Sequence, residues 1–243
     1  MPDTRTHRGP DPRDDLAFAP SAWPALRAAV ADLCWLLGRG YAPTSALKLV
    51  GDRWSLFERQ RAAVMRCACP DAALARRNRH QVPLAEIRDR PLFLDGFNVL
   101  TTIEAALGGA FVLRGRDGTY RDLAGVHGTY RKVEETRPGL ALLGELLATL
   151  GAGPSFWYLD RPVSNSGRLK ALILDAAAER GWDWRVELVF NPDSLLVVAP
   201  EIVATADGAI LDRCDRWVNL ARAAIDHAVP SARIIDLSPH PDS

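Results

Sequence analysis

The chain has 243 residues, 48% of them hydrophobic and 25% charged, which suits one large or two small domains and excludes an intrinsically disordered protein. Its 30 Lys and Arg residues balance 30 Asp and Glu residues, so no overall charge draws the protein to nucleic acid. The charge is nevertheless uneven, because residues 25–90 hold 12 basic against 6 acidic residues, and residues 91–243 hold 15 against 20. A basic region joined to an acidic one is compatible with a nucleic-acid grip beside a metal site, and equally with two domains that dock through opposite charges.

The four cysteines and the N-terminus bear on the cellular compartment. Cys34, Cys67, Cys69 and Cys214 include no C-x-x-C pair, so we expect buried free thiols and no zinc site. No segment reaches the roughly 18 apolar residues that a membrane helix needs. The N-terminus also lacks the apolar segment of a signal peptide. Together these features predict a cytoplasmic protein with no membrane span.

The first part of the chain is predicted to be helical. Residues 1–20 are polar and rich in proline, and we expect a flexible lead-in. Apolar residues at helical spacing then predict helices over 24–40, 46–50 and 52–68. Residues 21–88 are therefore expected to form a small, basic, all-helical domain.

Two arginines of the third predicted helix are candidate substrate contacts. Arg59 and Arg66 lie seven residues apart and so share one face of a helix. They either contact phosphate groups or belong to a solvated face paired with nearby carboxylates. Both interpretations stay open from the sequence.

From Pro91 onward, short apolar runs alternate with helical patterns. This alternation predicts a mostly parallel sheet covered on both faces by helices. The predicted strands are 92–94, 155–160, 185–190 and 201–207, with a hairpin of 111–113 and 119–121 around Asp117-Gly118 and further edge strands at 218–220 and 234–237. The predicted helices are 103–109 with Thr101 or Thr102 as its cap, 138–151 capped by Thr136, one after the turn at 161–167, and 208–214.

Several of these strands end in a carboxylate. Asp95, Asp160 and Asp207 each close a predicted strand, and Asp193 follows another as a weaker case. Parallel strands present their carboxyl ends at one edge of a sheet, so we expect these side chains to converge. Converging carboxylates raise one another's pKa unless a hard divalent cation neutralises them. The pattern predicts a Mg²⁺ or Mn²⁺ site able to hydrolyse a phosphodiester. The alternative is that each Asp caps the helix after its strand, and this alternative is strongest for Asp160.

Two further polar residues flank the predicted metal site. Asn98 is expected to orient a ligand or to hold the backbone near Asp95. Asp212 comes five residues after Asp207, across a short helix, and is expected to join the carboxylates or to lie directly behind them.

The segment LDGFNVL resembles the opening strand of PIN-like nucleases, particularly the NYN branch, whose signature is D-G-x-N after an apolar strand. IVATADGAIL resembles their later strand, which ends in a T-x-D motif before a short helix. The resemblance covers roughly residues 91–225 and implies a metal-dependent ribonuclease in which Asp95 and Asp207 bind the metal beside Asn98. Asp160 and Asp212 match the pattern less specifically.

The resemblance also implies an acidic residue on the helix after the first strand, for which Glu104 is the candidate and Asp122 the alternative. GDRWSLFERQR, RDLAGVHGTYR and LDRPVSNSGRL make the whole chain similar to a prokaryotic family with no assigned activity. In that family a helical module precedes a PIN-like domain. The implied fold is α/β: a PIN-like three-layer domain over 89–243 with a mostly parallel central sheet, preceded by a small all-helical domain.

Substrate contacts are predicted at two places besides the arginines of the helical domain. The first is a helix start flanked by arginines, where free N–H groups suit a phosphate: Ser164, Asn165, Ser166 and Arg168, with Arg161 before them. A well-capped helix entry is the alternative for the serines. The second is GVHGTYRK, where Tyr130 and Arg131 suit stacking on a base or contact with phosphate, and where His127 is more simply explained as structural.

The sequence therefore supports two hypotheses. The first is a Mg²⁺- or Mn²⁺-dependent endoribonuclease whose partner is RNA. The second is a non-catalytic RNA-binding protein with a degenerate PIN-like site. No G-x-G-x-x-G or G-x-x-x-x-G-K-[ST] motif is present, so we expect no nucleotide cofactor.

Overall fold

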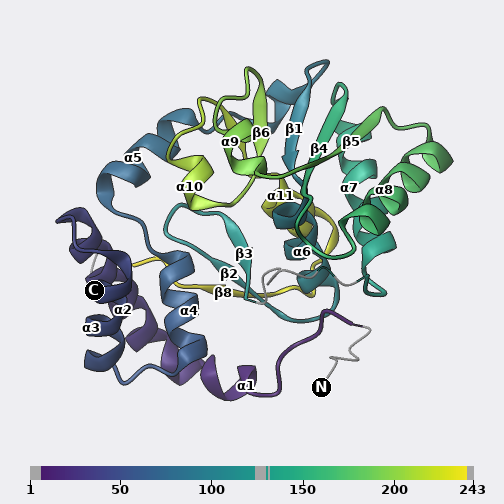
Figure 1. The fold of residues 1–243 in the computed structure, drawn as a ribbon. Helices are drawn as coiled ribbons and strands as arrows, with labels where there is room; N and C mark the ends of the chain where they lie inside the picture. Colours follow the sequence, from purple (N-terminus) through teal and green to yellow (C-terminus); the bar gives the residue numbers. More distant parts are fainter. Residues whose placement is uncertain (1–6, 124–129, 131, 240–243) are drawn as a thin grey trace.

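A computed structural model describes residues 7–123, 130 and 132–239 of the chain. Five parallel strands form the main sheet in the order β5-β4-β1-β6-β7 (Figure 1). These strands are β1 (Leu92–Asp95), β4 (Ser155–Asp160), β5 (Trp184–Val189), β6 (Ile202–Ala204) and β7 (Trp217–Val218). The predicted α/β class with a parallel sheet after N-terminal helices is thereby confirmed.

Helices cover both faces of the main sheet because side chains alternate along each strand. Leu92, Leu94 and Trp157 point into one apolar core with four helices, whereas Val203 and Trp217 point into a second core with two short helices. On the first face lie α6 (Gly96–Leu107), α7 (Thr136–Leu150), α8 (Ser166–Arg180) and α11 (Leu220–Ala228); on the second lie α9 (Pro192–Leu196) and α10 (Gly208–Leu211).

A second sheet of three strands stands apart from the main one. The predicted hairpin is confirmed as β2 (Phe111–Arg114) and β3 (Tyr120–Asp122), with Gly118 at φ +72° in the turn. The left-handed region favours glycine there, because a side chain would meet the backbone. β8 (Arg233–Asp236), expected at the edge of the main sheet, instead pairs in parallel with β2.

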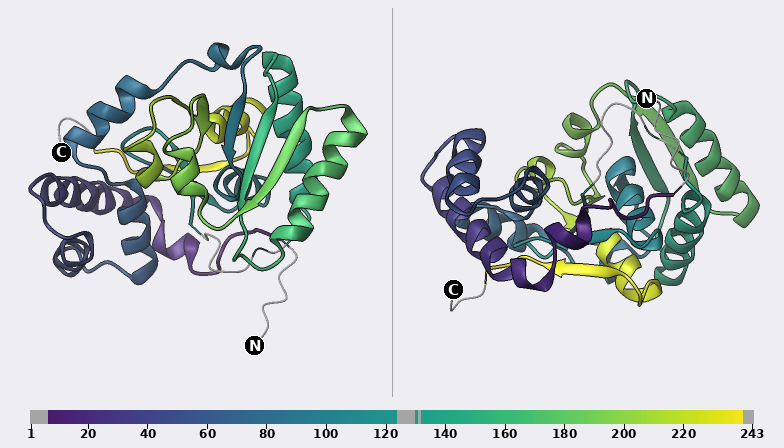
Figure 2. Two further views of the ribbon diagram at one scale, coloured as in Figure 1. Left: turned by 45° about the horizontal axis from the view of Figure 1, so that its top comes forward. Right: turned by 90° about the horizontal axis from the view of Figure 1, so that it is seen from below.

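The N-terminal helices pack on this second sheet. Their side chains share one apolar core with Phe111, Leu113 and Ile235 of β2 and β8. Figure 2 shows the N-terminal helices beside this sheet, at the end of the molecule away from α8. The elements are α1 (Asp14–Ala17), η1 (Pro20–Ala22), α2 (Trp23–Gly38), α3 (Pro43–Arg53), α4 (Glu58–Cys67), α5 (Asp71–His80) and η2 (Leu84–Ile87).

Three sequence predictions need correction in this region and after β1. The helix expected over 52–68 is interrupted at residues 54–57, where Ser55 adopts a φ of 50° and the chain turns before α4. In place of the flexible lead-in, residues 7–20 pack against the protein, and Phe18 is buried. Helix α6 begins at Gly96, so Thr101 and Thr102 do not cap it but donate hydrogen bonds to carbonyls four residues earlier.

Two compositional predictions can also be compared with the structure. All four cysteines are free and buried, as expected. Within the described ranges, every helix is too short or too polar to cross a membrane.

Candidate functional site

Four aspartates lie along the carboxyl edge of the main sheet. Asp95 and Asp160 are the last residues of β1 and β4, which are neighbours in the sheet. Asp193 lies on α9 directly after β5, and Asp207 lies between β6 and α10. Because these strands are parallel, their carboxyl ends lie at the same edge of the sheet (Figure 1), and the four aspartates are placed at or just after those ends.

Hydrogen bonds join the segment after β1 to the segment after β6. The Thr205 hydroxyl donates to Oδ2 of Asp95 at 2.8 Å and accepts from the backbone N–H of Asp207 at 2.9 Å. Oδ1 of Asn98 accepts from the backbone N–H of Ala206 at 2.8 Å. Asn98 therefore has the predicted role of holding the backbone near Asp95. The D-G-x-N and T-x-D segments form one connected unit.

The four carboxylates influence one another electrostatically. Burial raises the pKa of Asp95 to about 7; the hydrogen bond from Thr205 opposes this shift, while Asp207, Asp193 and Asp160 add to it. Burial also raises the pKa of Asp160, with Asp193 contributing, and the pKa of Asp193, with Asp207 contributing. Asp193, the weaker case from the sequence, therefore belongs to the group. We call these four side chains the carboxylate edge.

Helix capping accounts for little of this arrangement. One oxygen of Asp207 accepts from the backbone N–H of Ala209 at 2.7 Å, which is the capping role proposed as the alternative. Asp95 makes no such bond to α6, and the residue before α8 is Asn165, not Asp160. Capping therefore explains one contact of one member of the carboxylate edge.

The fit of the carboxylate edge to a divalent cation is partial. Its donors are all carboxylate oxygens, the ligands that Mg²⁺ and Mn²⁺ prefer, and no described Lys or Arg forms an ion pair with them. However, nowhere in the described residues do three His, Cys, Asp or Glu side chains already stand in an arrangement that could hold a metal. The residue types suit such an ion, but the side chains are not gathered around one point.

Asp212 does not join the carboxylate edge. It accepts from Nε of Arg77 at 2.6 Å, and Nη1 of Arg77 also donates to Asp117 at 2.5 Å. Asp117 is in turn bound by Arg121, whose Nε donates to the carbonyl of Ala206 at 2.8 Å. Asp212 thus lies behind the turn that carries Asp207. This is the second of the two positions that the sequence predicts for Asp212.

This buried charge network was missed from the sequence. Arg77, Asp117 and Arg121 are 4%, 6% and 8% exposed, and they come from α5, the hairpin turn and β3. The only sequence signal at Asp117 is the D-G turn, and Arg77 stands in a polar, arginine-rich stretch of the expected helical domain. Nothing in their spacing indicates that they meet.

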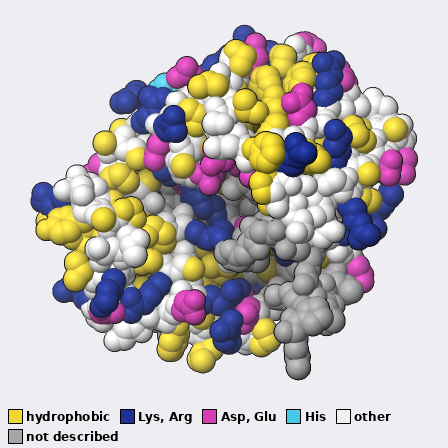
Figure 3. Space-filling model, in the orientation of Figure 1, with side chains coloured by type: hydrophobic (Ala, Val, Ile, Leu, Met, Phe, Trp, Pro, Cys, Tyr) yellow, Lys and Arg dark blue, Asp and Glu magenta, His cyan; other side chains and the backbone are white. Residues whose placement is uncertain are grey.

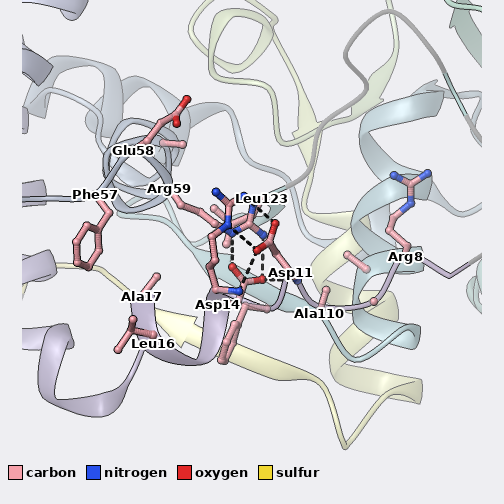
Figure 4. Close-up of a pocket in the computed structure, with 15 residues that line it drawn as sticks. Arg8, Asp11, Asp14, Leu16, Ala17, Phe57, Glu58, Arg59, Ala110 and Leu123 are labelled. Carbon is pink, nitrogen blue, oxygen red and sulfur yellow. Dashed lines mark hydrogen bonds and ion pairs between the residues drawn. The ribbon is translucent and has the colours of Figure 1, made fainter. Parts of the chain in front are cut away.

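The two arginines of α4 that the sequence predicts to contact substrate, Arg59 and Arg66, are bound within the protein. Arg59 forms a two-point ion pair with the buried carboxylate of Asp14, through its Nε and Nη2 atoms. Arg66 donates to the backbone carbonyl of Asp122 at 2.8 Å. For Arg59, the structure supports pairing with a nearby carboxylate. Figure 4 shows Arg59, Asp11 and Asp14 joined at the wall of a pocket of ≈ 620 Å³ that lies apart from the carboxylate edge.

The start of α8 anchors the chain to Tyr130. Asn165 adopts a φ of 68°, and its Nδ2 donates to the carbonyl of Tyr130 at 2.9 Å. Ser166 is buried and contacts the carbonyl of Arg161 at 3.4 Å, whereas Ser164 and Arg168 are exposed. Arg131, a predicted substrate contact, and His127 lie outside the described residues.

Glu104 forms a closed network away from the carboxylate edge. It is fully buried and accepts from the hydroxyls of Tyr130 at 2.5 Å and Thr136 at 2.7 Å, and from Nε of Arg8 at 2.6 Å. Its alternative, Asp122, is buried near Arg66. Neither is among the charges that raise the pKa of Asp95, whereas Asp160 and Asp193 are.

Comparisons with known proteins match two parts of this chain to families of unknown function. Residues 84–223 match the family described as "Domain of unknown function (DUF5616)", and residues 25–80 match "Protein of unknown function (DUF434)". The chain is 30% identical over 198 residues to "Uncharacterized protein MJ0935" of Methanocaldococcus jannaschii, which covers 81% of this chain and 94% of that protein. No solved structure matches the chain. The chain therefore belongs to the DUF5616 family, in a form that carries a DUF434 region before the main sheet.

Proposed function

We propose that this protein is a divalent-metal-dependent endoribonuclease that hydrolyses RNA phosphodiester bonds at the carboxylate edge. One observation carries the proposal: the carboxyl of Asp95 is buried beside the three other members of the carboxylate edge and forms no ion pair with a described cation, and burial raises its pKa accordingly. Such a concentration of uncompensated carboxylates is unfavourable alone and becomes favourable when a divalent ion binds.

The connections between strands support a PIN-like assignment for this domain. In the sheet order β5-β4-β1-β6-β7, the strand that precedes D-G-x-N lies between the strand ending in Asp160 and the strand preceding T-x-D. Thr205 and Asn98 then fasten the two motifs together. Motif order and motif contact thus point to the same kind of site.

Each polar residue has a definite role in this proposal. Asp95 and Asp207 would hold a Mg²⁺ or Mn²⁺ ion, with Asp160 and Asp193 beside them, and Thr205 would keep one oxygen of Asp95 in place. The ion supplies activation of a water molecule and neutralises charge on the phosphate. The contact of Asn98 with Ala206 keeps the two strand ends together while substrate binds and leaves.

The surface next to the carboxylate edge suits a polyanion. Figure 3 shows a hollow in the middle of this face, with acidic side chains along its upper rim and Lys or Arg side chains within it. A nucleic-acid backbone in the hollow would place phosphates against the basic side chains and one phosphate near the acidic rim.

The test is an RNA-cleavage assay with Mg²⁺ or Mn²⁺, using end-labelled single-stranded and hairpin RNA. Asp95→Asn and Asp207→Asn are expected to reduce cleavage to the level that the wild type shows with a chelator. Asp215→Asn is the matched control. Asp215 is exposed, and its ion pair is with Arg76, which is not part of the carboxylate edge. Cleavage that survives both substitutions at the carboxylate edge would rule the proposal out.

A second candidate function is favoured by one observation. Among the described residues, no three acidic side chains are arranged to bind one metal ion. This observation favours a protein that binds RNA without cleaving it. In that case RNA affinity would be the same with and without the divalent ion, and Asp95→Asn would leave it unchanged. The same assay, read by gel shift, separates the two functions.

A further inference from the structure

An unusual amount of apolar surface is exposed beside the carboxylate edge. Phe190 is 73% exposed, and Leu195 and Val198, eight or fewer residues further on, are 43% and 73% exposed. The same short segment carries Asp193. Exposing a large apolar side chain to water is unfavourable, so an exposed aromatic ring next to a polar site is a candidate for binding a ligand.

An arginine covers one face of the Phe190 ring. Arg161 follows Asp160 at the end of β4, and its backbone N–H donates to the carbonyl of Val189 at 2.7 Å, at the end of β5. Its guanidinium carbon lies 4.9 Å from the centroid of the Phe190 ring. The two side chains therefore extend from two neighbouring strands, immediately beyond the edge that holds Asp160.

This pair matches the chemistry of a nucleotide. An aromatic ring offers a surface on which a base stacks, and a guanidinium offers charge to a phosphate. With 73% of Phe190 exposed, the ring has room for a base in addition to Arg161. A purely apolar partner surface would leave the guanidinium without a counterpart, so the pair fits a nucleotide better than an apolar protein surface.

We propose that Phe190 and Arg161 form a stacking site for an unpaired base of the RNA strand held at the carboxylate edge, which makes single-stranded RNA the substrate class. The inference rests on the proposed function for the cleavage step, but base binding is measured separately. Bases in a duplex remain stacked on one another and do not present a free face to a side chain, so duplex RNA is not expected to use the site.

The experiment measures RNA affinity in Mg²⁺ in an Asp95→Asn background, in which cleavage is blocked. Fluorescent single-stranded RNA and a duplex of the same sequence are titrated against four additional variants. Phe190→Ala and Phe190→Leu are expected to weaken single-strand binding roughly tenfold, because both remove the ring, and to leave duplex binding unchanged. Phe190→Trp is expected to retain the affinity and to show quenching of its fluorescence by RNA. Val198→Ala, which trims equally exposed surface without a ring, is the matched control.

The outcomes separate this inference from the proposed function. Single-strand affinity that is unchanged in Phe190→Ala overturns the stacking site, whatever the cleavage assay gives. A ring-dependent affinity combined with no cleavage by the wild type keeps the stacking site and rejects the nuclease. If Phe190→Ala and Val198→Ala both reduce the mass of an oligomer and leave RNA affinity unchanged, the patch is a protein contact and the inference is wrong.

Discussion

Two buried aspartates of this protein have opposite electrostatic environments. Asp95 and Asp117 are 8% and 6% exposed. Burial raises the pKa of both carboxyls, but the guanidiniums of Arg121 and Arg77 hold the pKa of Asp117 well below its usual range. Burial raises the pKa of Asp95, and its neighbours among the described residues are the Thr205 hydroxyl, which opposes the shift, and three carboxylates, which add to it. The ionised carboxylate of Asp117 therefore stabilises the folded state, whereas ionisation of Asp95 destabilises it.

This difference predicts how Asp95 affects stability in metal-free protein. Because the native pKa of about 7 exceeds the unfolded value of 3.8, the folded state binds the proton more tightly, and stability falls as the pH rises from about 4 to about 7. Asp95→Asn removes this loss. In chelator at pH 8 the variant should be more stable than the wild type by up to about 4 kcal/mol, and at pH 4 the two should be equal. Urea unfolding at both pH values measures the difference.

A divalent ion should reverse that order. Mn²⁺ bound by the folded wild type raises its melting temperature, since a ligand that binds only the native state stabilises it. The Asp95→Asn variant, with a weaker site, should gain less. Equal gains in the two proteins would show that the ion binds elsewhere, and a wild type more stable than the variant in chelator at pH 8 would contradict the raised pKa.

At the scale of elements, the turn that carries Asp207 is held by two segments far away in sequence. Arg121 on β3 donates to the carbonyl of Ala206, and Arg77 on α5 donates to the carbonyl of Gly208 at 3.3 Å. Asp117 at the hairpin turn joins the two arginines. The N-terminal helices therefore help to position one side of the carboxylate edge.

Arg77→Met is expected to be strongly destabilising. It leaves Asp117 with a single arginine and removes a charge that is 4% exposed, and breaking a buried pair in this way costs about 3–5 kcal/mol. Arg79→Met on the same helix is the matched control, because Arg79 is exposed. Its expected cost is below about 0.5 kcal/mol. Comparable losses in the two variants, by denaturant unfolding, would mean that the network adds nothing beyond helix propensity.

The elements that the sequence predicted well are those with a local signature. The strands β1, β4 and β5 are short apolar runs that stop abruptly, and the hairpin carries Asp117-Gly118 at its turn. The break between α3 and α4 has no such signature. It depends on Ser55 adopting a positive φ, a conformation imposed by tertiary packing and not by the residue.

The same distinction applies to the candidate site. Asp95, Asp160 and Asp207 were recognisable because each ends a strand, and parallel strands bring their ends together. Asp193 carried a weaker signal because it lies one residue inside α9, after Pro192. The pairing of Glu104 with Arg8 joins residues 96 apart in the chain, so only the folded structure reveals that this acid is already bound.

At the scale of the whole molecule, the N-terminal helices and the second sheet depend on one apolar core. Phe111 and Leu113 on β2, and Ile235 and Leu237 at β8, pack with residues of α2 and α4 such as Leu33 and Val64. The N-terminal segment is tied in separately, by the pair of Arg8 with the buried Glu104. The region of the DUF434 match is therefore part of the structural support of the sheet region.

This shared core predicts that the sheet region does not fold alone. A fragment of residues 84–243 keeps all four members of the carboxylate edge but exposes the apolar side chains of β2 and β8 that the helices cover. Exposing one fully buried apolar side chain costs about 1.5–3 kcal/mol of folding free energy. The summed cost of several such side chains exceeds the free energy of unfolding of an ordinary domain. We expect the fragment to lack a cooperative thermal transition and to aggregate.

Co-expression with residues 1–83 should restore a folded complex, because the contacts that the two pieces make do not require the chain to be continuous at 83–84. Circular dichroism and gel filtration of the fragment alone, of the co-expressed pair and of the intact chain measure this directly. A fragment 84–243 that melts cooperatively and elutes as a monomer would show that its core is complete without the helices. Because this fragment lacks Arg77, a carboxylate edge that kept its function in the fragment would mean that the N-terminal helices do not position the turn of Asp207.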